Sequence, residues 1–362
     1  MADFLGGSAM KLFTIGPVEM FNEVKKFRSE MTIPYFRTTE FSNLMLDTDI
    51  LLKKFAGASK NSKTIYLTAS GTAAMEAAIM NCFSQNDKLL VINGGTFGQR
   101  FSDICKVHKI PFAEIKLKYG EVLTPQHFRE FENKNFNGLL VNLHETSTGQ
   151  LYDIKIISDF CKRNNLFLVV DAISTFLCDD FNMEKFGVDV MITSSQKGVC
   201  IEPGMAIVIL NEKILERVLK IDSQSIYFDF KDYIKNFERG QTPFTPAVGI
   251  CFQLNFALHL IEKRGLENHL KNIENIAMDF RNKIKSLPVS VPNFPLSNAL
   301  TPIIFEKDIA YDVFETLKNQ YNIFVNPTGG ALGKKVLRVA HIGQIDFDDN
   351  TALVKLLKDV LK

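Results

Sequence analysis

The run Val188-Asp189-Val190-Met191-Ile192-Thr193, followed directly by Ser194-Ser195-Gln196-Lys197-Gly198, decides the fold that we expect for this chain. Its β-branched and aliphatic residues predict a buried strand that ends shortly before Lys197. A second run of this kind, Leu166-Phe167-Leu168-Val169-Val170, ends at Asp171. A lysine and a carboxylate at the ends of two buried strands can face each other across one pocket. Because a lone lysine is more often a solvated surface group, this interpretation needs support from the rest of the sequence.

Short apolar runs alternate with amphipathic stretches through the first two thirds of the chain. The strand candidates are residues 64–67, 88–92, 111–115, 138–143, 166–170, 188–193 and 205–210, and the helix candidates between them are 72–82, 98–108, 154–164 and 183–186. Such alternation indicates βαβ units and predicts an α/β fold with a mostly parallel sheet. Ligands bind beyond the carboxyl ends of the strands in these sheets, so the residues that follow each strand are the candidates for a site.

The pattern changes after about residue 247. Two long helical stretches, 248–264 and 266–286, precede several prolines and a small α+β pattern that continues to residue 362. We therefore expect a large domain with an N-terminal arm over residues 12–250 and a smaller C-terminal domain over 251–362. Residues 1–11 are interpreted as a leader or a cloning remnant, because the sequence from Met10 onward looks like a fresh start.

The composition excludes several classes of function. Lys+Arg number 42 and Asp+Glu 41, a net charge of +1, so no overall field favours nucleic acid or an anionic membrane. No apolar run reaches the roughly 18 residues of a membrane span. The cysteines show no CxxC pair and no cluster with metal-ligand spacing, which predicts no metal site and reduced thiols in a cytoplasmic protein. They are Cys82, Cys105, Cys161, Cys178, Cys200 and Cys251.

Two strand ends carry segments suited to a phosphorylated aromatic ligand. After the first strand, Ser70-Gly71-Thr72 opens directly into a helix, where free N–H groups and hydroxyls form a cradle for phosphate. Taken alone, such a segment is more often a plain capped turn between a strand and a helix. After the second strand, glycines flank Phe97, which can present a flat face to a heteroaromatic ring. A role in the core is the default for any one of 31 phenylalanines.

Two further strand ends add a hydroxyl loop and an acid. The loop His144-Glu145-Thr146-Ser147-Thr148-Gly149 can offer a hydroxyl to a ring substituent. The carboxylate of Asp171 needs a cationic or hydrogen-bonding partner if it is buried, and a pyridinium N–H is such a partner. A helix N-cap is the structural alternative for Asp171. Together with Lys197, these features match the requirements of pyridoxal 5'-phosphate, which are a lysine, a ring acid and a phosphate cradle.

The same segments resemble the class V aminotransferases. This branch of the fold type I pyridoxal-phosphate enzymes includes alanine/serine–glyoxylate (or pyruvate) and 2-aminoethylphosphonate aminotransferases. The matching stretches run in family order and are residues 14–18, 70–77, 93–100, 145–149, 170–174, 187–197, 242–246 and 337–343. The resemblance therefore covers nearly the whole chain from about residue 12.

The resemblance implies a set of cofactor contacts. Lys197 matches the lysine that holds the cofactor as a Schiff base, and Asp171 matches the partner of the pyridine nitrogen. The phosphate contacts implied are Ser70, Gly71, Thr72 and Gln196, with Thr245 reaching over from the neighbouring subunit of a homodimer with shared active sites. Phe97 stands where the family places a stacking Trp or Tyr, and Thr146 where it places a hydrogen bond to the ring hydroxyl.

The resemblance also implies substrate contacts and a reaction. Arg338 matches the arginine that grips a substrate carboxylate, Gly16 belongs to the matching N-terminal segment, and Arg37 is a candidate for a second anionic group such as a phosphonate. Structural alternatives are an ion pair for Arg338 and a surface or dimer contact for Arg37. The implied reaction is a ping-pong transfer, through Lys197 and Asp171, from a small amino acid or aminophosphonate to a 2-oxo acid such as pyruvate or glyoxylate. The identity of the donor and the acceptor stays open.

Two other interpretations use the same residues. A pyridoxal-phosphate lyase of the desulfurase type would need a nucleophilic cysteine on a mobile loop, and no cysteine stands in an evident loop of that kind. A binding protein that has lost catalysis is the second alternative. The presence of both Lys197 and Asp171 argues against it.

Overall fold

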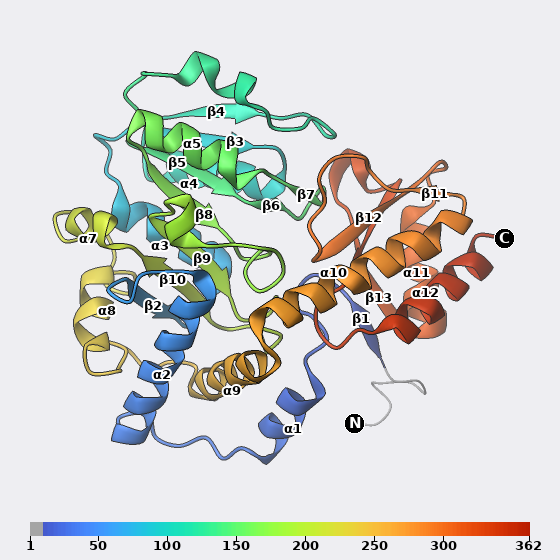
Figure 1. Ribbon diagram of the computed structural model, residues 1–362, viewed down its shortest axis with the longest axis horizontal. Coiled ribbons are helices and arrows are strands. Elements are labelled where there is room, and N and C mark those ends of the chain that lie inside the picture. Colours follow the sequence, from blue (N-terminus) through green and yellow to red (C-terminus); the bar gives the residue numbers. More distant parts are fainter. Residues whose placement is uncertain (1–9) are drawn as a thin grey trace.

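A computed structural model describes residues 10–362, and its larger sheet has the strand order β2-β10-β9-β8-β5-β3-β4 (Figure 1). Most of the segment interpreted as a leader, residues 1–9, lies outside the described residues. The strands are β2 (Lys63–Leu67), β3 (Leu89–Asn93), β4 (Phe112–Lys116), β5 (Gly138–Asn142), β8 (Phe167–Asp171), β9 (Val190–Ser194) and β10 (Ala206–Leu210). Each overlaps a run that the sequence predicts to be a strand.

The strand directions agree with the predicted α/β fold. Strands β9, β8, β5, β3 and β4 are parallel to one another, whereas β10 is antiparallel to both of its neighbours, β9 and β2. The carboxyl ends of the parallel strands therefore lie along one edge of the sheet. Asp171 is the last residue of β8, and Lys197 follows β9 by three residues, so both belong to that edge.

Helices cover both faces of the larger sheet. Alternate strand residues contribute to two apolar cores. One core packs against α3 (Gly71–Cys82), α4 (Thr96–Val107), α7 (Glu212–Val218) and α8 (Phe230–Phe237). The other packs against α2 (Thr39–Ala56), α5 (Ile154–Asn164), α6 (Met183–Phe186) and α9 (Val248–Arg264). Residues of β3 show the alternation, because Leu89 and Val91 belong to the first core and Leu90 and Ile92 to the second.

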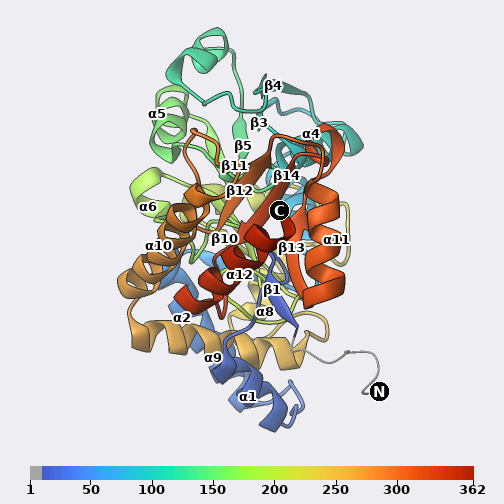
Figure 2. The same cartoon turned by 90° about the vertical axis from the view of Figure 1, so that its right-hand side faces the viewer.

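A smaller sheet, with the order β1-β13-β14-β12-β11, has its own core (Figure 2). Its strands are β1 (Lys11–Phe13), β11 (Val289–Ser290), β12 (Leu300–Phe305), β13 (Ile323–Pro327) and β14 (Val336–Ala340). Helices α10 (Leu266–Lys283), α11 (Ala310–Tyr321) and α12 (Phe347–Val360) pack on it. The remaining elements are α1 (Asn22–Glu30), the hairpin β6 (His144–Glu145) and β7 (Gln150–Leu151), and the 3-10 turns η2 (Pro125–Phe131), η3 (Ile284–Ser286) and η4 (Gly330–Leu332).

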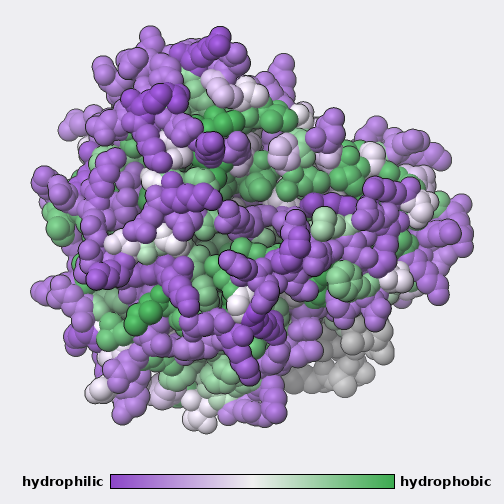
Figure 3. All heavy atoms as spheres, viewed as in Figure 1, coloured by the Kyte–Doolittle hydropathy of each residue, from purple (hydrophilic) through white to green (hydrophobic). Residues whose placement is uncertain are grey.

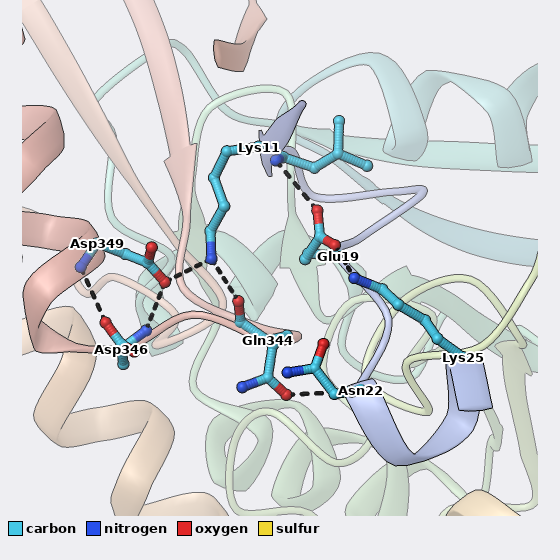
Figure 4. Close-up of polar contacts among 8 residues, drawn as sticks. Lys11, Glu19, Asn22, Lys25, Gln344, Asp346 and Asp349 are labelled. Carbon is cyan, nitrogen blue, oxygen red and sulfur yellow. Dashed lines mark hydrogen bonds and ion pairs between the residues drawn. The ribbon is translucent and has the colours of Figure 1, made fainter. Parts of the chain in front are cut away.

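The N-terminal arm joins the two parts of the molecule. Strand β1 pairs in parallel with β13, and the Lys11 ammonium donates to the Asp349 carboxylate at 2.6 Å and to the Gln344 carbonyl at 2.9 Å (Figure 4). The backbone carbonyl of Glu19 accepts from the Gln344 N–H at 2.8 Å, and the Glu19 carboxylate forms an ion pair with Lys25. Residues 14–18 lie between these anchors, and the Val18 N–H donates to the Gln196 carbonyl in the turn after β9. The predicted domain division near residue 250 stays a prediction.

The face seen in Figure 3 is mostly hydrophilic, with smaller hydrophobic areas between the polar side chains. Among residues 10–362, no helix has the length and apolar character needed to cross a membrane.

Candidate active site

Lys197 lies in a buried turn directly after β9. Its side chain is covered, with 8% of the residue exposed, and its Nζ donates a hydrogen bond to Ser174 Oγ at 2.8 Å. Burial lowers the pKa of Lys197 to about 8, although the negative charge of Asp171 opposes this effect. The N-terminal arm covers the lysine, because a Cβ built on Gly16 would lie 3.1 Å from Lys197 Cε. Val18 also donates its N–H to the Gln196 carbonyl at 3.2 Å.

Asp171 lies on the strand next to the one that leads to Lys197. Its Oδ1 accepts from the Ile173 N–H at 2.9 Å, and no side-chain hydrogen bond to it is seen within residues 10–362. Burial raises the pKa of Asp171 to about 6, while the Ile173 N–H and the charge of Lys197 act in the opposite direction. The two buried groups thus influence each other through their charges, as the sequence predicts for groups that share one site.

The segment 70–72 begins helix α3 beside these residues. Ser70 is the exposed N-cap residue, and a Cβ built on Gly71 would lie 2.4 Å from Ile173 Cδ1 and 3.4 Å from Ser194 Oγ. The helix N-terminus therefore approaches the ends of β8 and β9 closely, and only glycine leaves this space open. Thr72, in the first turn, accepts a hydrogen bond at its hydroxyl from Arg100 Nη1 at 2.9 Å.

Phe97 lies in the first turn of α4 and faces two cations. The Arg100 guanidinium carbon is 4.8 Å from the centroid of the Phe97 ring, and Lys197 Nζ is 5.7 Å from it. Arg100 is a residue that the sequence reasoning missed. Its position three residues after Phe97 places both side chains on one helix face, and this spacing is the signal that could have identified it.

Thr146 and Arg338 are brought together from the two parts of the molecule. Arg338, on β14, donates from Nη1 to the Thr146 carbonyl at 2.7 Å and from Nη2 to the Pro327 carbonyl at 2.6 Å. Burial lowers the pKa of Arg338, and the negative charge of Glu145 opposes that shift. The structure therefore holds the guanidinium by backbone carbonyls, whereas an ion pair was the structural alternative.

Arg37 and Thr245 belong to a separate group around residues 241–245. Arg37 donates to Gln241 Oε1 at 3.2 Å, to the Thr242 carbonyl at 2.8 Å and to the Pro243 carbonyl at 3.0 Å. These bonds support the segment that leads to Thr245, whose side chain is exposed. The hydrogen bonds of Arg37 thus stay within this group, away from those of Lys197 and Arg338.

Buried polar atoms without a hydrogen-bond partner occur at several places in the described chain, and three of them belong to the site around Lys197. They are Ser194 Oγ, which faces Gly71, His144 Nε2 in the hydroxyl loop and Arg338 Nε. Buried polar groups are normally hydrogen-bonded, so these three atoms are available to a polar ligand or to water. A phosphate-bearing aldehyde fits, because the site offers a partly neutral lysine, a buried acid and a glycine-opened helix N-terminus.

The cysteines do not supply a nucleophile for lyase chemistry. All six are free and buried, and burial raises the pKa of Cys178 and of Cys200, the two nearest to Lys197 in sequence. A reactive cysteine needs exposure and a lowered pKa. This environment gives the desulfurase-type alternative no support.

Known aminotransferases match this chain over most of its length. The model of the family described as aminotransferase class-V matches residues 35–342. An uncharacterized aminotransferase of Methanocaldococcus jannaschii is 33% identical over 314 residues, covering 85% of this chain and 81% of that protein. The L-aspartate–glyoxylate aminotransferase of Paracoccus denitrificans is 27% identical over 351 residues, covering 92% and 86%. The crystal structure of an alanine–glyoxylate aminotransferase from Nostoc sp. has a TM-score of 0.92 at 24% identity, covering 99% of this chain and 97% of that one. This structural likeness confirms the expected fold.

Proposed function

This chain belongs to the class V aminotransferases, and we propose that it moves the amino group of a small amino acid or aminophosphonate to a 2-oxo acid such as pyruvate or glyoxylate, with pyridoxal 5'-phosphate as cofactor. The observation that carries this proposal is the buried Lys197 beside Asp171, at the carboxyl ends of adjacent parallel strands. The Paracoccus relative is named an L-aspartate–glyoxylate aminotransferase, which supports glyoxylate as the proposed acceptor.

The cofactor contacts follow from the positions of the side chains. We assign the phosphate to the α3 N-terminus at Ser70, Gly71 and Thr72, because helix N-terminal N–H groups and the macrodipole favour an anion. Gln196 directly precedes Lys197 in the turn after β9, and we assign it to the surroundings of the phosphate. The half-buried ring of Phe97 provides the stacking face.

The ring substituents of the cofactor require two polar partners. Asp171 is assigned to the protonated ring nitrogen, which would remove the cost of a buried, nearly unpaired carboxylate. Thr146 is assigned to the ring hydroxyl of the cofactor. Arg338 bonds to the backbone carbonyl of Thr146, so the buried side-chain hydroxyl of Thr146 is left for this role.

The residues of the chain divide the catalytic work. When bound, pyridoxal 5'-phosphate supplies a ring that accepts the electrons of a carbanion at the substrate Cα. Lys197 Nζ, as a free amine, would accept the proton of the substrate Cα and hold it within the site. Arg338 orients the substrate carboxylate through its planar fork. The arm at Gly16 covers Lys197 and excludes water from the reacting atoms.

The proposal includes a cytoplasmic homodimer with shared active sites. Thr245 is exposed in the single chain, and the backbone on either side of it is held by Arg37 and by Thr68, whose hydroxyl accepts from the Ala247 N–H at 2.9 Å. A rigid, exposed hydroxyl is suited to reach the phosphate cradle of a second subunit. Arg37 supports this segment, and its use for a second anionic substrate group is a further part of the proposal. Six buried free cysteines suit a reducing compartment.

A half-reaction screen tests the proposal. The purified protein is loaded with pyridoxal 5'-phosphate and mixed with alanine, serine, aspartate or 2-aminoethylphosphonate, while the visible absorption of the bound cofactor and the 2-oxo product are followed. Lys197→Ala should abolish the transfer, whereas Lys220→Ala, at an exposed lysine, should not change it. Transfer by Lys197→Ala at the wild-type rate would show that the assignment of the lysine is wrong.

A further inference from the structure

Glu145 is a fully buried carboxylate that the proposed reaction does not use. None of its surface is exposed, and its charge interacts with that of Arg338 without a hydrogen bond between the two side chains. Its oxygens accept hydrogen bonds from the N–H groups of Phe97 at 3.2 Å and Gly98 at 3.0 Å. They also accept from the Ser147 N–H at 3.2 Å and from Ser147 Oγ at 2.5 Å. A buried carboxylate whose hydrogen-bond donors are all neutral is costly, and its position calls for an explanation.

The first two of these bonds fix the start of helix α4. Gly95 is the N-cap residue of this helix and has no side chain to cap it. A Cβ built on Gly95 would lie 2.5 Å from Glu145 Cδ, so the carboxylate occupies the place of a capping side chain. A negative charge at a helix N-terminus is also favoured by the macrodipole. Glu145 therefore determines where the first turn of α4, and with it the ring of Phe97, is placed.

The other bonds fix the loop that holds Arg338. Ser147 folds back on the Glu145 carboxylate, and the N–H groups of Thr148 and Gly149 donate to the Glu145 carbonyl at 3.0 and 2.8 Å. Thr146 lies between these fixed points, and its carbonyl accepts from Arg338 Nη1 at 2.7 Å. A displacement of this loop would therefore move the guanidinium of Arg338.

We propose that Glu145 is a positioning residue that fixes where the Phe97 ring lies relative to the Arg338 guanidinium. It would thereby fix where the cofactor ring lies relative to the substrate carboxylate. The inference rests on the proposed function, because it takes Phe97 as the stacking face and Arg338 as the carboxylate site. One carboxylate thus links a helix of the larger sheet to an arginine on the smaller one. It acts on Phe97 through the N–H groups at the start of α4 and on Arg338 through the loop at Thr146.

The variant Glu145→Gln tests this role in the pyridoxal-phosphate-loaded protein. The amide offers one acceptor oxygen in place of two and turns an NH2 group toward N–H donors. Loss of a hydrogen bond to a charged acceptor predicts a rise of roughly tenfold in KM for the amino donor, larger than the change in kcat. The visible circular dichroism of the bound cofactor should change because Phe97 moves. Backbone hydrogen exchange should become faster at residues 96–98.

Two further variants separate positioning from general stability. Ser147→Ala removes one donor from Glu145 and should shift KM and the circular dichroism in the same direction by a smaller amount. Glu114→Gln is the matched control, since Glu114 accepts from Ser102 Oγ at 2.7 Å and Asn93 Nδ2 at 2.8 Å without contacting the α4 N-terminus. It should leave KM and the spectrum unchanged.

The outcomes distinguish this inference from the proposed function. A wild-type protein that neither binds pyridoxal 5'-phosphate nor transfers amino groups contradicts the proposed function itself. With an active wild type, wild-type KM and circular dichroism in both Glu145→Gln and Ser147→Ala overturn the positioning role. If Glu145→Gln does not fold, Ser147→Ala decides the question alone, and a wild-type result from it overturns the inference.

Discussion

Replacement of Asp171 by asparagine should make the cofactor-free protein more stable at pH 8 and the loaded enzyme less active. Asparagine has nearly the same shape and keeps an oxygen for the Ile173 N–H, which donates to Asp171 Oδ1 at 2.9 Å. The change therefore removes the buried charge and little else. Its effect on the free energy of unfolding measures how much stability the buried carboxylate costs the cofactor-free protein.

The magnitude follows from the pKa of Asp171. Burial raises this pKa to about 6, while the carboxyl of an unfolded chain has a pKa of about 3.9. At a pH between these two pKa values, the folded chain keeps a proton that the unfolded chain has lost. The free energy of unfolding therefore falls as the pH rises through this range. Above the folded pKa the loss is complete and amounts to about 3 kcal/mol at 1.36 kcal/mol per unit. Asp171→Asn avoids this loss, so its advantage is absent near pH 4 and complete at pH 8.

Urea unfolding of the cofactor-free protein at pH 4, 5 and 8, followed by circular dichroism, measures the difference. Asp103→Asn serves as the control, because Asp103 is exposed and pairs only with neighbours on its own helix. In the loaded enzyme, Asp171→Asn should lower the rate of amino transfer by on the order of 10²-fold, since the ring proton loses its charged partner. A stability difference that is the same at every pH would refute the reasoning, because it would mean that the carboxylate carries no desolvation cost.

Three other predictions concern the lysine, the arginine and the backbone near the dimer segment. The rate at which pyridoxal 5'-phosphate bonds to the cofactor-free protein should rise with pH through about 8, because only the neutral amine of Lys197 reacts, and a pH-independent rate in stopped-flow absorbance would contradict this. Arg338→Lys should raise KM for the amino donor by about tenfold or more in steady-state kinetics, because a lysine keeps the charge but cannot form the planar fork. Gly240→Ala should lower the free energy of unfolding by about 2 kcal/mol or more, because Gly240 has φ +68° and its added Cβ would lie 2.3 Å from the Ser42 carbonyl oxygen. Gly120→Ala, with φ +84° and no atom within 4 Å of its added Cβ, should cost only about 1 kcal/mol in the same urea titration.

The larger sheet could be predicted from the sequence because its strands are buried on both faces. Runs such as Val169-Val170 and Val190-Met191 are apolar at every position, and turn or helix signals separate them. The positions of Asp171 and Lys197 followed from the same fact, since a polar residue after such a run marks the carboxyl edge of the sheet. Local signals were sufficient for these residues.

Contacts between distant segments could not be predicted in the same way. Glu145 bonds to Gly98, 47 residues earlier, and Arg100 bonds to Thr72, 28 residues earlier. Glu145 follows β5 by three residues, as Lys197 follows β9, but its partners at the start of α4 are set by tertiary packing. Arg100 lies inside α4, so the rule that identified Lys197 did not apply to it. Arg37 illustrates the same difficulty, because its partners on residues 241–243 are set by the packing of α2 and not by its local sequence.

The parallel pairing of β1 with β13 has a consequence for synthesis on the ribosome. Residues 11–13 are translated before the larger sheet, but their partners, Ile323–Val325, are translated after the whole of it. The larger sheet can therefore form while the arm has no strand to join. Until the last strands emerge, Gly16 has no anchor from the smaller sheet to hold it against Lys197. In a nascent chain the arm would thus cover the lysine through the Val18–Gln196 hydrogen bond alone, and translation of β13 would add the second anchor.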